Sequence, residues 1–205
     1  MVKTRIAVFV SGGGTNLQAL IDARNRGELT SGEIVLVLST RADSYALVRA
    51  KNAGIPTAVC SRRELGSQAA FEWAVEAELA AHGVDMIVLA GFLSILSADF
   101  TLRWTDRIIN VHPSLIPAFC GKGFYGLRVH EAALAYGVKV TGATVHYVNE
   151  IPDGGQIILQ KAVDVLPGDT PEILQRRVME QAEWILLPRA AELVARRLME
   201  EGERR

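Results

Sequence analysis

The sequence predicts an α/β fold: a doubly wound, Rossmann-like and mostly parallel sheet with an antiparallel strand addition near the C-terminus and a long C-terminal helix. In the first half of the chain, apolar β-rich runs alternate with segments of helical period, as in a sheet whose strands are joined by helices. These runs are apolar throughout, which is typical of parallel strands that helices cover on both faces. After residue 137 the pattern changes to two β-rich runs joined by a short connection.

The predicted strands follow one another with clear boundaries. Five are expected at residues 6–10, 34–39, 57–60, 86–90 and 108–111, with amphipathic helices between the earlier ones. The next two runs, VKVTGATVHYVN and GQIILQKAVDV, are joined only by EIPDGG, so we expect an antiparallel or edge addition to the sheet. The last helix begins after Thr170 with Pro171 in its first turn. Pro188 should kink this helix or divide it in two.

Composition narrows the class of protein. A chain of 205 residues fits one domain over 1–205 and can bury roughly 70% of its unfolded surface. Its 22 Lys and Arg residues nearly balance 23 Asp and Glu residues, which disfavours a nucleic-acid partner. Cys60 and Cys120 are too few for a disulfide framework and suit a reducing, cytoplasmic location. The apolar start stops at glycines without a cleavage site, and no run is long enough for a membrane span.

A glycine loop follows the first predicted strand. The string SGGGTNLQALIDA leads from that strand into a helix, so its glycines allow close approach of a ligand and the helix N-terminus favours an anion, with phosphate as the natural candidate. Leu17 stands where a dinucleotide fingerprint needs a small residue, which leaves Arg41 weak as a partner for an NADP phosphate. No Walker Lys follows the loop. A tight turn with a helix cap and no ligand stays open as the alternative.

Polar residues recur at the ends of later predicted strands. LAGFLSIL ends the fourth in a hydrophobic loop suited to a flat, partly apolar ligand, and INVHPSLI ends the fifth with Asn110 and His112. TGATVHYVNEIPDGG places Thr144 and His146 on a strand and Asp153 in a turn. Each of these residues alone is more often structural than functional. The four histidines lack short ligand spacings, so we expect no metal site.

Taken in order, these motifs resemble a known family. The strings SGGGTNLQAL, LAGFLSIL, NVHPSLIPAFCGKGFYG, GATVHYV and DGGQIILQ are similar to those of the phosphoribosylglycinamide formyltransferases, over residues 6 to about 188. Asn-x-His-Pro-Ser and Asp-Gly-Gly are features of the wider formyltransferase family. The resemblance implies formyl transfer from 10-formyltetrahydrofolate to the amine of glycinamide ribonucleotide in purine synthesis, without a metal. It also implies a phosphate-binding half up to about residue 105 and a catalytic, folate-binding half from about 106.

The resemblance assigns catalysis to Asn110, His112 and Asp153. Attack of an amine on a formyl carbon creates an oxyanion, which the Asn110 amide and a protonated His112 could stabilise. An isolated His is mostly neutral near pH 7, so we expect Asp153 to hold the proton on His112. As residues i and i+2 of a strand, Asn110 and His112 should project to one face.

Binding residues are also implied by the resemblance. The phosphate is expected on Gly14, Thr15 and Asn16, with the last helix contributing Glu183 and, less directly, Glu180; the spacing before Glu183 is one residue long beside RRV. The folate is expected against Gln68, Leu93, Ser94, Ile95, Leu96, Asn110, Asn149, Glu150, Ile151, Pro152 and Asp153. Gln68 and Ser94 stand where many relatives have a basic residue.

Other functions use some of the same residues. A 10-formyltetrahydrofolate hydrolase would need an added N-terminal domain and a methionyl-tRNA formyltransferase an added C-terminal one, and we expect room for neither. A non-catalytic nucleotide-binding module would have no use for Asn110, His112 and Asp153 together. The sequence identifies no dimer interface, although a homodimer is compatible with it. The glycines and aromatic residues of 119–128 suggest a loop that closes on the substrate.

Overall fold

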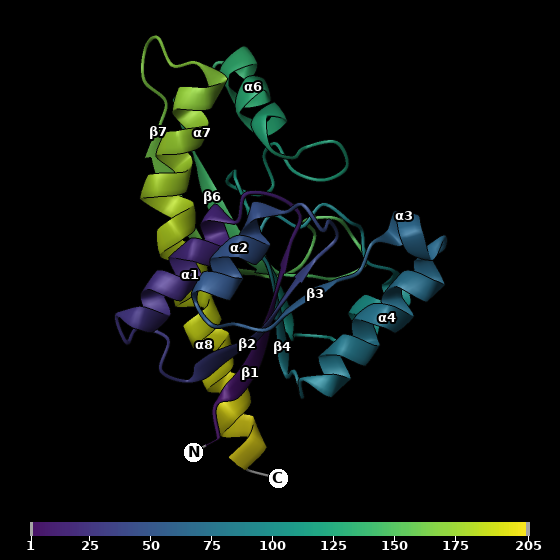
Figure 1. Ribbon diagram of the computed structural model, residues 1–205. Coiled ribbons are helices and arrows are strands. Elements are labelled where there is room, and N and C mark those ends of the chain that lie inside the picture. Colours follow the sequence, from purple (N-terminus) through teal and green to yellow (C-terminus); the bar gives the residue numbers. More distant parts are fainter. Residues whose placement is uncertain (1, 204–205) are drawn as a thin grey trace.

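The computed structural model describes residues 2–203 and shows one seven-stranded sheet with helices on both faces (Figure 1). The strands are β1 (Thr4–Val10), β2 (Gly32–Ser39), β3 (Thr57–Val59), β4 (Met86–Leu89), β5 (Ile108–His112), β6 (Val140–Tyr147) and β7 (Ile157–Asp164). The helices are α1 (Thr15–Asn25), α2 (Tyr45–Asn52), α3 (Arg62–Leu65), α4 (Gln68–Ala81), α5 (Ala98–Arg103), α6 (Leu127–Tyr136), α7 (Pro171–Val178), a π-helical turn η1 (Met179–Glu183) and α8 (Trp184–Glu203).

The strand order is β3-β2-β1-β4-β5-β6-β7. Strands β1 to β5 pair in parallel, while β6 pairs antiparallel with both β5 and β7. The predicted fold class is confirmed. The chain runs outward from β1 to β3 and then returns to β4 on the other side of β1, so the order reverses between β1 and β4. Parallel sheets bind their ligands at the carboxyl ends of the strands at such a switch point.

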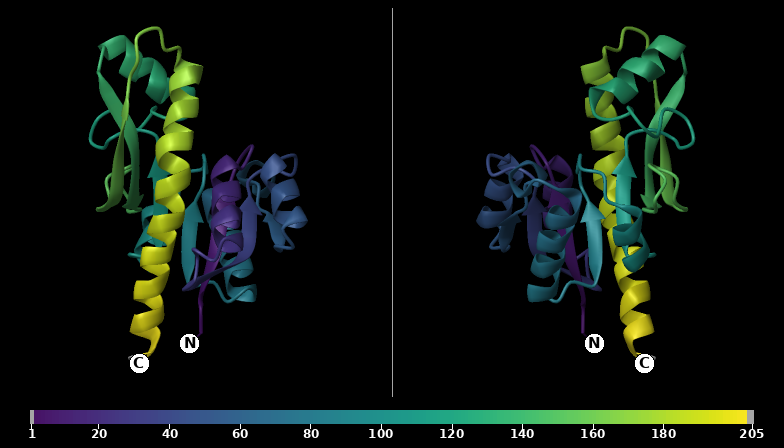
Figure 2. Two further views of the ribbon diagram at one scale, coloured as in Figure 1. Left: turned by 90° about the vertical axis from the view of Figure 1, so that its left-hand side faces the viewer. Right: turned by 90° about the vertical axis from the view of Figure 1, so that its right-hand side faces the viewer.

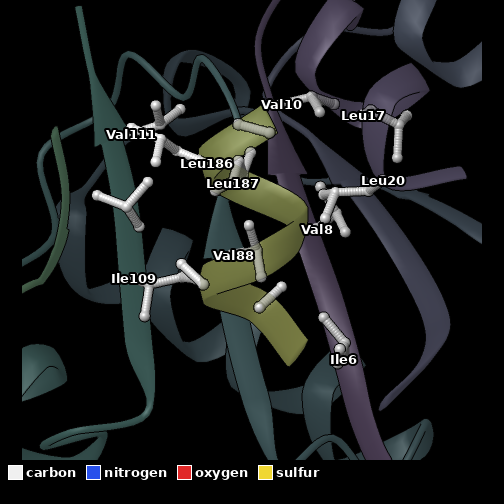
Figure 3. Close-up of a cluster of buried hydrophobic side chains, with 14 of the residues drawn as sticks. Ile6, Val8, Val10, Leu17, Leu20, Val88, Ile109, Val111, Leu186 and Leu187 are labelled. Carbon is white, nitrogen blue, oxygen red and sulfur yellow. The ribbon is translucent and has the colours of Figure 1, made fainter. Parts of the chain in front are cut away.

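Two cores cover the two faces of the sheet. Alternate side chains of a strand point to opposite faces, so Ile6, Val8 and Val10 of β1 pack toward α1 and α8, as Figure 3 shows. Ala7 and Phe9 pack on the other face, in a core that includes residues of α4 and α5. The first core also includes residues of β5, β6 and α8, and therefore joins the N-terminal and C-terminal halves of the chain.

The C-terminal helix corrects one expectation. Thr170 caps α7 by accepting from the backbone N–H of Ile173, as the sequence suggests. Pro188, however, lies inside α8, and α7, η1 and α8 form one long rod along the molecule (Figure 2). The expected division at Pro188 is wrong, since the irregular turn is η1, just upstream. Pro188 lacks an N–H, and its ring crowds the carbonyl of Trp184. The π turn ends just before Trp184, whose own N–H bonds to the Met179 carbonyl.

The antiparallel addition determines which polar residues meet. In the register of β5 and β6, Asn110 lies opposite His146, and His112 lies opposite Thr144. Strand β5 extends through His112, so both of its predicted catalytic residues are held by sheet hydrogen bonding. Within residues 2–203, no helix is both long enough and apolar enough to span a membrane.

Candidate active site

The glycine loop ends in a residue that has to be glycine. Gly14 is the N-cap of α1 in the left-handed conformation (φ 72°), and a Cβ there would lie 2.6 Å from the Cβ of Ala46. No side chain caps α1, and its first turn contains no acidic residue. The free backbone N–H groups of a helix N-terminus attract an anion. The local structure therefore suits the expected phosphate at Gly14, Thr15 and Asn16.

The carbonyl groups of the loop are held by α2 and the residue before it. The Gly12 carbonyl accepts from Ala46 N (3.1 Å) and Ser44 Oγ (2.7 Å), and the Gly13 carbonyl accepts from Arg49 Nε (2.9 Å). With these carbonyl oxygens engaged on the α2 side, the N–H groups of the loop stay available to a ligand. Arg49 was not singled out from the sequence, because nothing in an amphipathic helix marks the one Arg that reaches the loop.

Glu183 meets the loop from the far end of the chain. Its Oε2 accepts a hydrogen bond of 2.7 Å from Asn16 Nδ2, and both side chains are buried. Burial raises the pKa of Glu183 to about 6, although the Asn16 hydrogen bond lowers it. Glu183 is the last residue of η1, and a π turn takes up one residue more than an α turn. The unusual spacing before Glu183 is accommodated by this turn.

Most of the predicted folate-binding residues line one cleft. This cleft, of about 140 Å³, lies between the loop after β4 and the loop after β6. Its lining includes nine predicted residues: Ser94, Ile95, Leu96, Asn110, Asn149, Glu150, Ile151, Pro152 and Asp153. It also includes five that were not predicted: Leu89, Phe92, Thr101, His146 and Val148. Half of its lining residues are apolar, and the hydrogen bonds and close approaches among Asn110, His146 and Asp153 group these three at its polar end.

Two predicted residues do not line the cleft. The Gln68 amide donates to the Glu72 carboxylate (2.6 Å) and to the Ile95 carbonyl (3.1 Å), so it holds the β4 loop from the α4 side. Leu93 is 66% exposed in the same loop. Gln68 thus contributes to the shape of the cleft through the backbone of Ile95 rather than through a surface of its own.

The polar end of the cleft contains Asn110, His146 and Asp153. His146 Nδ1 lies 2.7 Å from the Tyr147 carbonyl, which can only accept, so Nδ1 carries the proton. In the neutral ring, Nε2 is then an acceptor, and the Asn110 amide donates to it over 3.2 Å. His146 therefore fixes the orientation of the Asn110 amide. The sequence placed His146 on a strand, but only the pairing of β5 with β6 reveals its role.

His112 lies behind the cleft and not in its lining. The ring is buried, its Nε2 donates to the Phe119 carbonyl (2.9 Å), and its Nδ1 is 3.5 Å from Asp153 Oδ2. Burial lowers the pKa of His112 below 6.5, and the attraction of Asp153 does not outweigh this. The expectation that Asp153 keeps His112 protonated is therefore wrong here, because desolvation of the charged ring dominates.

Asp153 receives interactions from three segments. Its carboxylate accepts from Gly121 N (2.8 Å) and approaches His112 and His146, the latter at 3.6 Å. Burial would raise the pKa of Asp153, but His146, His112 and the Gly121 N–H together lower it. Asp153 adopts φ 56°, and a Cβ on Gly155 would lie 1.8 Å from the Tyr147 carbonyl oxygen. The Asp-Gly-Gly turn thus combines a strained Asp with a glycine that no other residue can replace.

Other candidate ligands find less support in the geometry. Arg41, considered for an NADP phosphate, forms an exposed ion pair with Asp43 (2.7 Å). Among residues 2–203, no three His, Cys, Asp or Glu side chains are grouped to hold a metal ion. The segment 119–128, predicted to close on the substrate, contributes Phe119 and Gly121 to the surroundings of His112 and Asp153; its closure stays a prediction.

Known proteins are similar to this chain in sequence and in fold. The chain matches the family described as Formyl transferase over residues 4–190. It is 45% identical over 201 residues to the trifunctional purine biosynthetic protein adenosine-3 of Gallus gallus; the match covers 98% of this chain and only 19% of that relative. It is 43% identical over 177 residues to phosphoribosylglycinamide formyltransferase of Haemophilus influenzae, covering 86% of this chain and 81% of the relative. The crystal structure of glycinamide ribonucleotide transformylase 1 from Symbiobacterium toebii has a TM-score of 0.87 and 42% identity, covering 95% of this chain and 88% of that one.

Proposed function

Because the chain belongs to the formyl transferase family, we propose that it transfers the formyl group of 10-formyltetrahydrofolate to the amine of 5′-phosphoribosylglycinamide, giving N-formylglycinamide ribonucleotide and tetrahydrofolate in de novo purine biosynthesis. One observation carries the proposal: a cleft with a half-apolar lining contains Asn110, His146 and Asp153 side by side, at the same edge of the sheet as an uncapped glycine loop. The two free cysteines suit a reducing compartment, and we place the reaction in the cytoplasm.

The ribonucleotide occupies the glycine loop in this proposal. Its phosphate accepts from the backbone N–H groups at the start of α1, supported by the helix dipole. A carboxylate repels a phosphate, so Glu183 is better suited to accept hydrogen bonds from ribose hydroxyl groups than to contact the phosphate itself. Its hydrogen bond from Asn16 holds the carboxylate beside the loop. We therefore revise the expected role of Glu183 from phosphate binding to sugar binding.

The formyl donor occupies the cleft. Leu96, Ile151 and Phe92 offer apolar surface for a flat heterocycle, and the backbone of 149–153 offers polar groups at its edge. The chemical character of the lining fits a folate, which combines an aromatic ring system with hydrogen-bonding edges. The polar end of the cleft is the place for the formyl group, since the side chains that can act on it are found there.

Asn110 stabilises the charge that develops on the formyl oxygen. One N–H of its amide is directed to His146 Nε2, which leaves the other N–H for the oxyanion. An oriented donor of this kind contributes roughly 10²- to 10³-fold to the rate. Because the amide is fixed before the substrates arrive, no reorganisation is needed during the reaction.

The Asp153–His112 pair manages the proton that the attacking amine loses. The lowered pKa values mean that Asp153 is ionised and His112 neutral near pH 7. A neutral imidazole whose Nε2 hydrogen is engaged by Phe119 accepts a proton at Nδ1, where the Asp153 carboxylate stabilises the resulting charge. The pair is thus suited to receive a proton first and to release it to the folate nitrogen afterwards.

The decisive experiment is a formyl transfer assay with purified protein. We expect deformylated folate and N-formyl ribonucleotide to appear in equal amounts, and only when the amine substrate is present. Consumption of 10-formyltetrahydrofolate at the same rate without the amine would favour a hydrolase instead. Absence of both reactions, with binding of the ribonucleotide retained, would favour a non-catalytic nucleotide-binding module.

A further inference from the structure

Ser11 joins the two loops that the proposed reaction uses. It is the first residue after β1, is 6% exposed, and precedes the glycine loop. Its hydroxyl oxygen accepts hydrogen bonds from the backbone N–H of Leu93 (3.0 Å) and from the hydroxyl of Thr40 (3.0 Å). A hydroxyl oxygen has two acceptor positions, and both are used here to connect the ends of β1, β2 and β4.

The contact with Leu93 is the direct link between the loops. Within the described chain, no other hydrogen bond connects residues 11–16 with residues 91–97. The glycine loop is otherwise held from the α2 side, through the carbonyls of Gly12 and Gly13. The loop after β4 is otherwise held from the α4 side, where Glu72 accepts from Ser97 N (2.6 Å).

Ser11 also lies at the switch point of the sheet. Strands β1 and β4 are neighbours in the sheet, and they lead to the glycine loop and to the loop after β4 respectively. Ligands bound at these two loops therefore meet above the gap between β1 and β4. Hydrogen bonds hold the loop after β4 at Leu93 and at Ser97. Ser94 and Ile95, which lie between these two residues, line the cleft. The Leu93 N–H has no partner inside the protein once the Ser11 hydroxyl is removed.

We propose that Ser11 is a positioning residue that couples the two substrate sites: occupation of the glycine loop by the phosphorylated substrate strengthens binding of the formyl donor in the cleft, and the reverse. The inference rests on the proposed function. A ligand that immobilises the glycine loop restricts the motion of Ser11. Ser11 in turn restricts the backbone N–H of Leu93, near the start of the loop after β4. By thermodynamic linkage, each ligand must strengthen the other by the same factor.

The coupling can be measured without turnover. Tetrahydrofolate, which has no formyl group to give, is titrated into the protein by calorimetry with and without saturating 5′-phosphoribosylglycinamide. For the unaltered protein we expect the ribonucleotide to lower the Kd of tetrahydrofolate by roughly tenfold. The coupling ratio is the Kd of tetrahydrofolate without the ribonucleotide divided by its Kd with the ribonucleotide. In Ser11→Ala we expect this coupling ratio to fall below about two, while the Kd of each ligand measured alone changes far less than the coupling ratio does.

A matched control is available in Thr40. Thr40→Val removes the other hydrogen bond to Ser11 and leaves Leu93 bonded, so the ratio should stay at the unaltered value. Equal loss of coupling in Thr40→Val, retained coupling in Ser11→Ala, or a ratio of one in the unaltered protein would each overturn the inference. Formyl transfer by the unaltered protein is assayed in parallel, so that failure of the coupling is distinguished from failure of the proposed function.

A second measurement requires no variant and so does not depend on the folding of Ser11→Ala. Amide hydrogen exchange of residues 91–97 is followed in the unaltered protein with inorganic phosphate and with chloride at equal ionic strength. We expect phosphate to slow exchange at Leu93 severalfold, although phosphate alone does not extend into the cleft. Unchanged exchange at a phosphate concentration that protects residues 14–17 would contradict the coupling.

Discussion

The glycine loop and the polar end of the cleft are built by different means. Residues 11–16 are contiguous, and their binding groups are backbone N–H donors oriented by one left-handed glycine and the start of α1. Asn110, His146 and Asp153 come from β5, β6 and the turn that follows β6, and their groups are side chains that hydrogen bond or titrate. The loop is determined by local geometry, while the cleft depends on strand register.

Because the two sites are built differently, they are disrupted by different kinds of substitution. A backbone donor cannot be removed by changing one side chain, so the loop is disrupted through conformation. A titratable side chain can be neutralised without moving the backbone, so the cleft is disrupted through charge. Substitutions that alter only one of these properties therefore test the comparison directly.

Asp153→Asn should have the largest effect. Asn tolerates the left-handed conformation that Asp153 adopts (φ 56°), so the turn is retained while the charge is lost. We expect kcat to fall roughly 10²- to 10⁴-fold with modest changes in KM, because the proton on His112 loses its counter-charge. Steady-state kinetics measure this, with Glu150→Gln on the same loop as the control. A drop shared by both variants would assign the effect to the loop and not to the Asp153 charge.

Gly14→Ala should disturb the loop through conformation. Ala is unfavourable at φ 72°, and its Cβ would collide with Ala46. We expect KM for the ribonucleotide to rise roughly 100-fold, while KM for the formyl donor changes little. Gly54→Ala is the control, since Gly54 has a similar φ of 69° but nothing within 4 Å of an added Cβ. Equal increases in both Michaelis constants would show that the loop does not serve one substrate alone.

Glu183→Gln should separate binding from stability. Burial raises the pKa of Glu183 to about 6, so its contribution to folding is favourable at low pH and is lost as the pH rises through that value. From pH 5 to pH 8 the unaltered protein should lose about 1 kcal/mol of unfolding free energy that the variant does not lose. The substitution should also raise KM for the ribonucleotide roughly tenfold, through loss of a charged acceptor. Urea unfolding at the two pH values provides the test; a pH-independent difference would contradict the buried charge.

His130→Met should affect stability alone. His130 in α6 is 0% exposed, neither ring nitrogen has a partner, and burial lowers its pKa to about 4. A lowered pKa means that stability is present above pH 6.5 and decreases as the pH falls toward 4. Between pH 7 and pH 5 we expect the variant to lose about 2 kcal/mol less than the unaltered protein. Urea unfolding measures this, with the partly exposed His82→Met as control; equal slopes would show that His130 finds a partner in solution.

Much of the candidate site could be predicted because its motifs are local. Gly14, Thr15 and Asn16 follow a strand and begin a helix, and the loops 93–96 and 149–153 follow strands whose ends meet at one edge. The approach of Asp153 to His112 was also expected, and the atoms are 3.5 Å apart. The proton on His112 was predicted wrongly, because charge partners can be named from a sequence but the extent of desolvation cannot.

Residues that act through tertiary contacts escaped prediction. His146, Arg49 and Ser11 lie in ordinary strand, helix and turn patterns, and their contacts depend on the pairing of β5 with β6 and on the packing of α2 and the β4 loop. Pro188 was expected to interrupt its helix, but the rod continues through it because α8 packs against the core along its length.

The periodicity of the strands, the glycine conformations and the order of the polar motifs can be predicted from the amino-acid sequence, because each depends on neighbours a few positions apart. The identity of the histidine that faces the cleft, of the charge that is desolvated and of the hydroxyl that connects the two loops depends instead on how the chain packs. Burial and hydrogen-bond partners arise from segments that lie far apart in the chain, so their effects on proton affinity and orientation appear only when those segments pack together.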